Sequence, residues 1–286
     1  MNGSDVVNPS EPRLLILGAH PDDAEYHSGG LATLYSRMGA TVRMVSVTDG
    51  SAGHHQMQPA DLALRRRLEA GASGKLIGAE YVTWDHPDGS LQPSLDLRED
   101  IIREIRSFQP DLLLTHRTCD YHPDHRAVGQ AVQDACYMVT VPLILPDLPV
   151  MEYDPVVAYM PDPFTRPVPM RADVIIPIDD CLETIVKMLA CHESQFFEFL
   201  PHNMHATTPV PEQDDGKRQW LTDWYCQMLQ QRRERFDLQL VAHYGSQRAA
   251  TIKYIEVYEV SEYGRSLDVT LQSQLFPFLS TPQESP

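Results

Sequence analysis

Short apolar runs alternate with longer amphipathic segments along most of the chain. The runs have the length and composition of strands that are buried on both faces. They predict strands at 13–18, 41–47, 81–84, 111–115, 156–160 and 174–178, and an alternating run predicts an edge or terminal strand at 252–260. The segments between them repeat apolar residues at helical spacing. They predict helices at 25–38, 61–77, 97–108, 126–137 and roughly 219–235, and one from 179 or 180 to about 199.

This alternation predicts the fold class. Strands joined by helices pair in parallel through right-handed crossovers, so we expect an α/β fold in three layers, α/β/α, with a mostly parallel sheet. No repeat and no clear linker divides the chain, which indicates a single domain over 1–286. Its core is expected at about 13–200, further C-terminal elements at 201–276 and a disordered tail at 277–286. The proline-rich stretch 142–169 is expected to be a long irregular excursion with one strand.

Composition narrows the class of protein. The chain has 286 residues, of which 42% are hydrophobic and 22% are charged, as in ordinary globular enzymes. The formal net charge of -17 repels phosphate backbones and anionic lipid headgroups, so we expect no nucleic-acid partner and no membrane partner. No apolar run reaches transmembrane length. The cysteines form no C-x-x-C pair, which fits free thiols in a reducing compartment, so the cytoplasm is the expected location.

Two clusters of histidine and aspartate follow predicted buried strands. The first is Gly18-Ala19-His20-Pro21-Asp22-Asp23, and the second is Asp120-Tyr121-His122-Pro123-Asp124-His125. Loops at the carboxyl ends of parallel strands line the crevice where such sheets bind ligands, so the two clusters are expected to meet there. A single His-Pro-Asp turn is commonly structural, because proline sets φ and aspartate bonds its own backbone. Two such clusters at strand ends favour a functional site.

The residue types in these clusters point to a metal-dependent hydrolase. Catalytic zinc sites use three protein ligands from His and Asp/Glu and leave a fourth position for water. His20 and Asp23, with one histidine from the second cluster, supply such a set. Asp22 is then placed to take a proton from water, and His122 to stabilise an oxyanion or protonate a leaving group. Zn2+ suits these donors, and Fe2+, Mn2+ or Co2+ would also fit.

The clusters also resemble the signatures of a known family. AHPDDAEYHSGG and DYHPDHRAVG are similar to the paired motifs of the PIG-L (LmbE-like) N-deacetylases. Lys187 followed by His192-Glu193-Ser194-Gln195 resembles that family's K…H-x-S-Q segment. The resemblance covers about residues 13–200, with a similar ending at Val257–Gly264.

This resemblance implies a fold, an activity and a set of roles. It implies a Rossmann-like fold and zinc-dependent hydrolysis of an N-acyl group, usually the acetamide of an N-acetylglucosamine-type sugar. Carried over by position, His20, Asp23 and His125 are the metal ligands. Asp22 is the general base, and His122 is the electrostatic partner of the tetrahedral intermediate.

Substrate contacts are suggested by weaker matches. Arg66, with Glu69, resembles an R-x-x-E helix whose arginine reaches sugar hydroxyls, and Asp88 resembles a carboxylate that accepts from them. Tyr121 and His192 are further candidates for the pocket. Each also has an ordinary interpretation, as a helix, turn or packing residue. Many relatives carry T-x-G-E after the second strand where this chain has Thr48-Asp49-Gly50-Ser51, a departure in the loop that borders the substrate pocket.

Three hypotheses follow. The leading one is a deacetylase that acts on a small-molecule amino-sugar substrate. The second is a metal-dependent amidase or esterase acting on a non-sugar conjugate. The third is a catalytically silent binding protein, which the presence of all five motif positions disfavours. Relatives of this family often assemble, so a homo-oligomer is kept open, as are the physiological metal and the natural substrate.

Overall fold

A computed structural model describes residues 11–279, and their strands form one mixed sheet. The strand order is β3-β2-β1-β4-β5-β7-β6. All neighbours from β3 to β5 are parallel, whereas β7 is antiparallel to both β5 and β6. The strands are β1 (Arg13–Gly18), β2 (Thr41–Thr48), β3 (Glu80–His86), β4 (Leu112–Thr115), β5 (Val156–Tyr159), β6 (Val174–Pro177) and β7 (Ile255–Val260).

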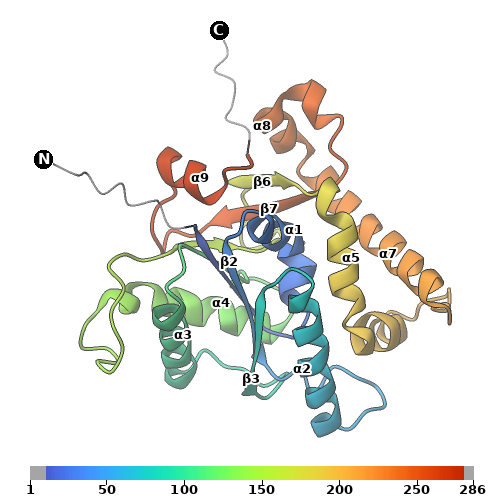
Figure 1. Ribbon diagram of the computed structural model, residues 1–286, viewed down its shortest axis with the longest axis horizontal. Coiled ribbons are helices and arrows are strands. Elements are labelled where there is room, and N and C mark those ends of the chain that lie inside the picture. Colours follow the sequence, from blue (N-terminus) through green and yellow to red (C-terminus); the bar gives the residue numbers. More distant parts are fainter. Residues whose placement is uncertain (1–10, 280–286) are drawn as a thin grey trace, which may run out of the picture.

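Helices cover both faces of this sheet, so the expected three-layer α/β/α fold with a mostly parallel sheet is confirmed. Figure 1 shows α3 and α4 on one side of the strands and α1, α2, α5 and α7 on the other. The helices are α1 (Asp23–Arg37), α2 (Pro59–Lys75), α3 (Leu95–Phe108), α4 (Pro123–Cys136), α5 (Leu182–Ala190), α6 (Leu200–Asn203), α7 (Asp214–Arg235), α8 (Asp237–Ala249) and α9 (Val269–Leu275).

Strand β1 shows how the two layers are built. Leu14 and Ile16 point into a core shared with α1, α5 and α7, while Leu15 and Leu17 point into a core shared with α3 and α4. All four side chains are fully buried. A strand that is buried on both faces has a continuous run of apolar residues. Strand β1 was therefore predictable from its sequence alone.

The chain reverses its path across the sheet at β1. It first proceeds from β1 to β2 and β3 on one side, and then returns to β4 and β5 on the other. The loops that leave β1 and β4 therefore diverge, and ligands of open α/β sheets bind in the crevice between such loops. Residues 18–23 follow β1 and residues 116–125 follow β4, so both His-Asp clusters lie at this crevice.

The run 252–260 was expected to form an edge or terminal strand, and β7 is terminal in the chain but does not lie at an edge of the sheet. It is the last strand in the chain, but it lies between β5 and β6, and β6 forms the edge. The residues of β7 alternate in the sequence because they point to opposite faces of the sheet. Ile255 and Val257 pack against α8, whereas Glu256 and Tyr258 point toward α1. Glu256 is fully buried, so its polar side chain marks an internal contact and not a solvated face.

The helical predictions also need correction in the C-terminal part. The helix expected from 179 or 180 to about 199 is broken into a 3-10 turn at Asp179–Cys181, helix α5 and a π-helical segment at Ser194–Phe199. Helices α8 and α9 were not predicted, because both segments have too few apolar residues at regular spacing to be recognised. Helix α7 begins several residues before the expected start at 219.

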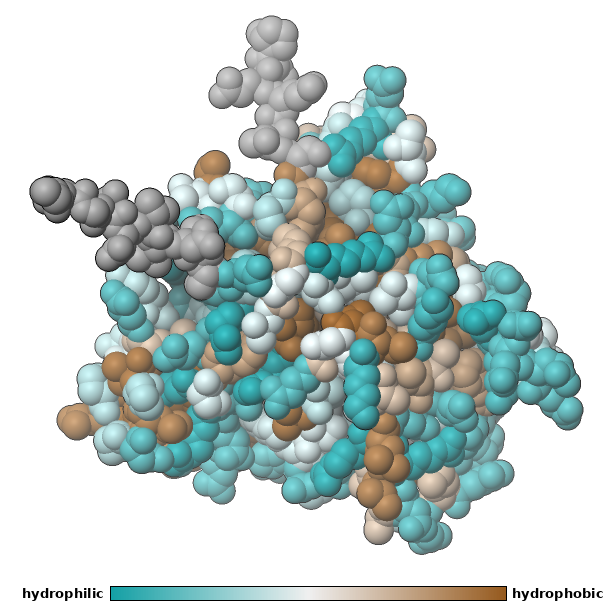
Figure 2. All heavy atoms as spheres, viewed as in Figure 1, coloured by the Kyte–Doolittle hydropathy of each residue, from teal (hydrophilic) through white to brown (hydrophobic). Residues whose placement is uncertain are grey.

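Two expectations concern the surface and the ends of the chain. Among residues 11–279, no helix is both long enough and apolar enough to cross a membrane. The face in Figure 2 is mainly hydrophilic, with a few apolar patches. Most of the tail expected to be disordered, residues 280–286, lies outside the described residues.

A buried carboxylate stabilises a break in helix α1. The backbone at Ser28 is non-helical, with φ of -142°, and this break frees N–H groups in the following turn. Gly30 N–H donates to Glu256 Oε1 at 2.6 Å, and Leu31 N–H donates to Glu256 Oε2 at 2.8 Å. Tyr258 Oη donates to the same carboxylate at 2.7 Å. Glu256 thus caps the second half of α1 from a strand that is distant in sequence.

Removal of this cap is expected to destabilise the protein. Glu256→Ala leaves two buried N–H groups without an acceptor, and the expected loss in the free energy of unfolding is about 2–4 kcal/mol. Glu256→Gln, which keeps one acceptor oxygen, should lie between the alanine variant and the wild type. Urea denaturation measures both, with Glu262→Ala as the control because the Glu262 side chain is 89% exposed. A Glu256→Ala variant within about 0.5 kcal/mol of the wild type would contradict the capping role.

Candidate functional site

The loop after β1 folds back on itself to present His20 and Asp23. A Cβ atom at Gly18 would lie 2.7 Å from Asp23 Cβ, so this close approach requires glycine. His20 N–H donates to Asp23 Oδ2 at 2.7 Å, and Asp23 N–H donates to His20 O at 3.2 Å. Asp23 then begins helix α1. The short loop therefore fixes one imidazole and one carboxylate side by side.

The loop after β4 is organised by its own side chains. His122 N–H donates to Asp120 Oδ1 at 2.9 Å, and Asp124 N–H donates to His122 Nδ1 at 3.2 Å. His122 is therefore the N-cap of α4, and Pro123 occupies the first turn, where its missing N–H has no cost. One turn later, His125 points back toward the first loop, within reach of His20.

Three candidate ligand atoms converge between the two loops. His20 Nδ1 lies 3.2 Å from His125 Nε2. Asp23 Oδ2 lies 3.4 Å from His20 Nδ1, and Asp23 Oδ1 lies 3.4 Å from His125 Nε2. A tetrahedral zinc ion with bonds of about 2.0–2.1 Å spaces its ligand atoms about 3.3–3.4 Å apart. The two histidine nitrogens are therefore spaced as zinc requires, whereas Asp23 approaches each histidine with a different carboxylate oxygen.

The outer nitrogen of each of the two imidazoles lies near a carboxylate. His20 Nε2 lies 3.2 Å from Asp88 Oδ1 and 3.4 Å from Asp124 Oδ2. His125 Nδ1 lies 3.0 Å from Asp120 Oδ1. Carboxylates at these positions favour the ring proton on the outer nitrogen, as do carboxylates that accept a hydrogen bond from a metal-binding histidine. Two lone pairs and one carboxylate then face the same point.

The charge distribution agrees with this arrangement. Burial lowers the pKa of His20 and of His125, but nearby carboxylates outweigh it, so the pKa of His20 lies well above its usual value and that of His125 is raised to about 9. The pKa of Asp23 lies well below its usual range, because His125 and His116 outweigh burial. The cluster therefore favours added positive charge, which a bound cation supplies as well as protons do.

His116 also belongs to this cluster, although the sequence analysis did not single it out. Its ring stacks on His125 with centroids 3.8 Å apart, and its Nε2 accepts from Ala19 N–H at 3.1 Å. The same nitrogen lies 3.2 Å from Asp23 Oδ2. Its position directly after β4 could have identified it, because residues at the carboxyl ends of parallel strands line the crevice, as the two motifs do.

Asp22 has a strained backbone next to the candidate ligands. Its φ is 135°, in a region that residues other than glycine rarely adopt. Its N–H donates to Tyr81 Oη at 3.1 Å, and its carboxylate lies 3.3 Å from Arg66 Nη2. Burial raises the pKa of Asp22 to about 6, although the Arg66 guanidinium opposes this shift. Such strain persists at functional sites when the surroundings hold it in place.

A buried polar network lies behind Asp22. Tyr81 Oη donates to Glu25 Oε2 at 3.2 Å, and Ser73 Oγ donates to Glu25 Oε1. His192 Nε2 lies 2.7 Å from Glu25 Oε1, and its side chain has no exposed surface. His192 therefore reaches the site through Glu25 and Tyr81. Its predicted pocket role stays a prediction.

The remaining candidate substrate contacts differ in exposure. Arg66 is buried and donates to Pro21 O at 2.7 Å and to Gly50 O at 3.1 Å, so it braces the loop that carries Asp22. Asp88 Oδ2 accepts from Ala52 N–H at 3.0 Å, and the other oxygen faces His20. Tyr121 is 66% exposed and lies edge-on to His125 at the rim. Their contacts with a substrate stay predictions.

His122 is half-buried and lies beside the candidate ligand His20. Its ring is edge-on to that of His20, with centroids 4.5 Å apart. Because Nδ1 accepts from Asp124 N–H, the ring proton is assigned to Nε2. His122 can therefore donate a hydrogen bond from Nε2.

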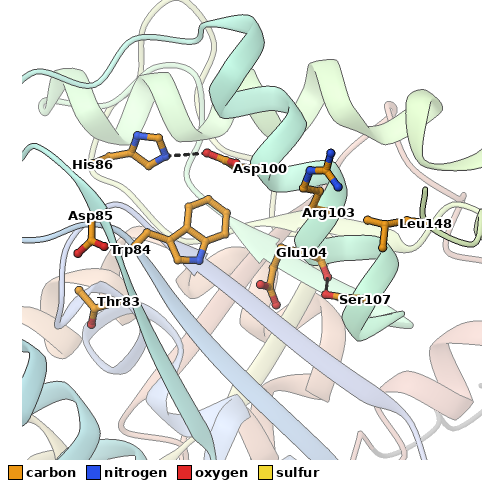
Figure 3. Close-up of a pocket in the computed structure, with 9 residues that line it drawn as sticks. All are labelled: Thr83, Trp84, Asp85, His86, Asp100, Arg103, Glu104, Ser107 and Leu148. Carbon is orange, nitrogen blue, oxygen red and sulfur yellow. Dashed lines mark hydrogen bonds and ion pairs between the residues drawn. The ribbon is translucent and has the colours of Figure 1, made fainter. Parts of the chain in front are cut away.

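A separate groove of about 690 Å³ lies between β3 and α3. Figure 3 shows Trp84 at its centre, with His86 directed at Asp100. Charged side chains that line the groove are already paired. Glu104 forms an ion pair with Arg43 at 2.7 Å, and Arg103 forms one with Asp147 at 2.6 Å. None of the predicted site residues lines this groove.

Comparison with known families gives a match over the segment that contains both motifs. Residues 15–136 match the family described as PIG-L, GlcNAc-PI de-N-acetylase. This segment runs from β1 to the end of α4, and so includes His20, Asp23 and His125.

Curated relatives include both deacetylases and a hydratase. The chain is 24% identical over 163 residues to 4-oxalmesaconate hydratase of Pseudomonas putida, covering 54% of this chain and 63% of that protein. It is 26% identical over 163 residues to 1D-myo-inositol 2-acetamido-2-deoxy-alpha-D-glucopyranoside deacetylase 2 of Saccharopolyspora erythraea, covering 47% and 60%. The match thus spans about three fifths of the length of these two relatives. An uncharacterized deacetylase of Escherichia coli, YaiS, is 29% identical over 139 residues, covering 46% and 71%.

Solved structures share the fold over nearly the whole chain. N,N'-diacetylchitobiose deacetylase from Pyrococcus horikoshii superposes with a TM-score of 0.68 at 22% identity, covering 91% of this chain and 88% of that one. GalB, the 4-carboxy-2-hydroxymuconate hydratase from Pseudomonas putida, superposes with a TM-score of 0.69 at 20% identity, covering 90% and 98%. The chain therefore contains a PIG-L family domain at residues 15–136, within a fold that LmbE-like deacetylases share.

Proposed function

We infer that this protein is a zinc-dependent hydrolase that removes an N-acyl group, most simply acetyl, from an N-acetylglucosamine-type sugar or conjugate. The observation that carries this proposal is the convergence of His20 Nδ1, Asp23 and His125 Nε2 at 3.2–3.4 Å, with the Asp22 carboxylate beside them. The deacetylases among the relatives support the reaction class.

The residues of the chain supply the remaining chemistry. A divalent cation, when bound by His20, Asp23 and His125, supplies Lewis acidity toward water and the amide carbonyl. Asp22 accepts the proton of the attacking water, and contacts with Tyr81 and Arg66 hold the residue in place. His122 donates from Nε2 to the oxygen of the tetrahedral intermediate. The C–N bond then breaks, and the amine nitrogen takes up the proton that Asp22 received.

Removal of one ligand should abolish tight metal binding. Mutation of a residue that hydrogen-bonds to a metal ligand lowers metal affinity by about 10–100-fold. Loss of a ligand itself in His125→Ala is therefore expected to lower zinc affinity by at least about 100-fold. Zinc titration of apo-protein, with metal content measured by mass spectrometry, checks this expectation. His243→Ala is the matched control, because His243 lies in α8, outside the cluster. Wild-type zinc affinity in His125→Ala would contradict the ligand assignment.

Asp22→Asn should separate metal binding from turnover. The asparagine side chain has the same shape and tolerates positive φ, but it accepts no proton, so kcat should fall by about 100- to 10,000-fold while zinc remains bound. Acetate release from N-acetylglucosamine and N,N'-diacetylchitobiose measures this loss. Asp214→Asn, at the exposed start of α7, is the control. Full activity in metal-loaded Asp22→Asn would exclude Asp22 as the base.

Activity should rise with pH as Asp22 ionises. Burial raises its pKa to about 6, and only the ionised carboxylate accepts a proton. A bound cation stabilises the ionised form and lowers this pKa, so the acid limb of kcat/KM should have its midpoint at or below about pH 6. Measurements of kcat/KM from about pH 4 to 8 on the metal-loaded protein test this. A midpoint above about pH 7 would point to another base.

A second reaction class is favoured by one specific observation. A hydratase is among the relatives in both the sequence and the structure comparison. Addition of water to a carbon–carbon double bond needs the same activated water and the same base, but it forms no amine. An unsaturated carboxylate substrate, followed by loss of its ultraviolet absorbance, distinguishes hydration from deacylation. Amides and esters without a sugar test the remaining hydrolase alternative.

A further inference from the structure

Helix α2 carries apolar side chains on its outer face that no residue of 11–279 covers. Leu64 is 62% exposed and Leu68 is 68% exposed, one helical turn apart. Figure 2 shows this apolar surface over α2, toward the lower edge of the view. Gly71 lies one turn further on, and a Cβ atom added there would meet nothing within 4 Å. The outer face of α2 is therefore apolar and open.

These residues belong to a regular seam along the helix. We use the name outer seam for Asp61, Leu64, Leu68, Gly71 and Lys75. Their spacing alternates between three and four residues, which places all five on one stripe of an α-helix. This is the spacing with which one helix packs along a second helix in a coiled coil.

The outer seam is complementary to itself about Leu68. Asp61 and Lys75 lie seven residues before and after it, and Leu64 and Gly71 lie on opposite sides of it. When two copies of the helix pack antiparallel with their centres at Leu68, Asp61 faces the partner's Lys75 at both ends. Leu64 then faces the partner's Ala72, an exposed residue whose small side chain leaves room for a leucine. A twofold axis produces this pairing with a single surface patch.

The charges at the two ends favour this occupant over others. Both Asp61 and Lys75 are exposed, and within residues 11–279 neither takes part in an ion pair. An anionic lipid surface would repel Asp61, whereas a second copy offers a lysine to each aspartate. We propose that the outer seam of α2 is the interface of a twofold-symmetric homodimer.

The interface and the candidate site use opposite faces of the same helix. The inner face of α2 buries Leu62, Arg66 and Glu69, and Arg66 holds the loop of Asp22. The proposal therefore does not depend on the proposed reaction. A single pair of helices of this length is about 25 Å long and buries less than the roughly 1,200 Å² typical of stable dimers. The dimer is expected to form and dissociate within the micromolar range.

Sedimentation velocity from about 1 to 300 µM tests the proposal on the full chain. The wild type should show a concentration-dependent monomer–dimer equilibrium, and Leu68→Lys should raise the dimer Kd by at least about 10-fold. Leu238→Lys, at a leucine that is 81% exposed on α8, is the matched control and should leave Kd unchanged. Circular dichroism melting confirms that each variant is folded. A wild type that stays monomeric, or a dimer unaffected by Leu68→Lys, would overturn the proposal.

Charge reversal tests the antiparallel pairing itself. Asp61→Lys alone places like charges opposite each other at both ends and should weaken the dimer, as should Lys75→Asp alone. The double variant restores opposite charges across the twofold axis and should recover a Kd within about 3-fold of the wild type. Failure of the double variant to recover would exclude this arrangement. Zinc content should be the same in all of these variants, which separates loss of the interface from damage to the candidate site.

Discussion

The carboxylate of Asp23 is the group on which the rest of the site depends, because it joins four parts of the fold. It accepts the His20 N–H and so closes the loop after β1, and it begins helix α1. It also lies 3.2 Å from His116, which follows β4, and 3.4 Å from His125 on α4. Without a charge that attracts both imidazoles, the loops that diverge from β1 and β4 would have no common point. One aspartate thus brings together the side chains of the candidate cation site, which sheet topology places at the same crevice.

The polar groups behind this centre explain how a strained residue is tolerated beside it. Positive φ at an aspartate costs on the order of 1–3 kcal/mol, and the structure must offset this cost. Tyr81 accepts the N–H of Asp22, and Arg66 binds both the preceding carbonyl and the Asp22 carboxylate. Tyr81 is in turn held by Glu25, which His192 contacts. Buried hydrogen-bond networks of this kind rigidify their surroundings, so the strain is maintained at a fixed geometry.

The sequence predicted features that depend on local pattern and missed those that depend on a distant partner. Strand β1 was predicted at its observed bounds, because a strand buried on both faces has a continuous apolar run. Strand β7 was expected to be an edge or terminal strand, and nothing in the alternation of Ile252–Val260 indicates that Glu256 binds the backbone of α1. The two motifs placed His20 and His125 together through the strand-end rule, whereas His116 has no motif around it. Its place in the cluster arises from its stacking on His125 and its contact with Asp23, both of which depend on distant parts of the chain.

The candidate substrate contacts beneath the rim of the site are already engaged within the protein. The donors of Arg66 are engaged with backbone carbonyls, both oxygens of Asp88 are occupied, and His192 is fully buried. Selection among substrates therefore falls to groups at the rim, such as Tyr121 and the loop that carries Ser51 in place of the glutamate of many relatives. A rim on loops varies without disturbing the ligands beneath it. The proposed centre, a cation that activates water next to a base, would serve both amide hydrolysis and the hydration of a double bond, so under this proposal the electrophile that enters the site determines which reaction follows.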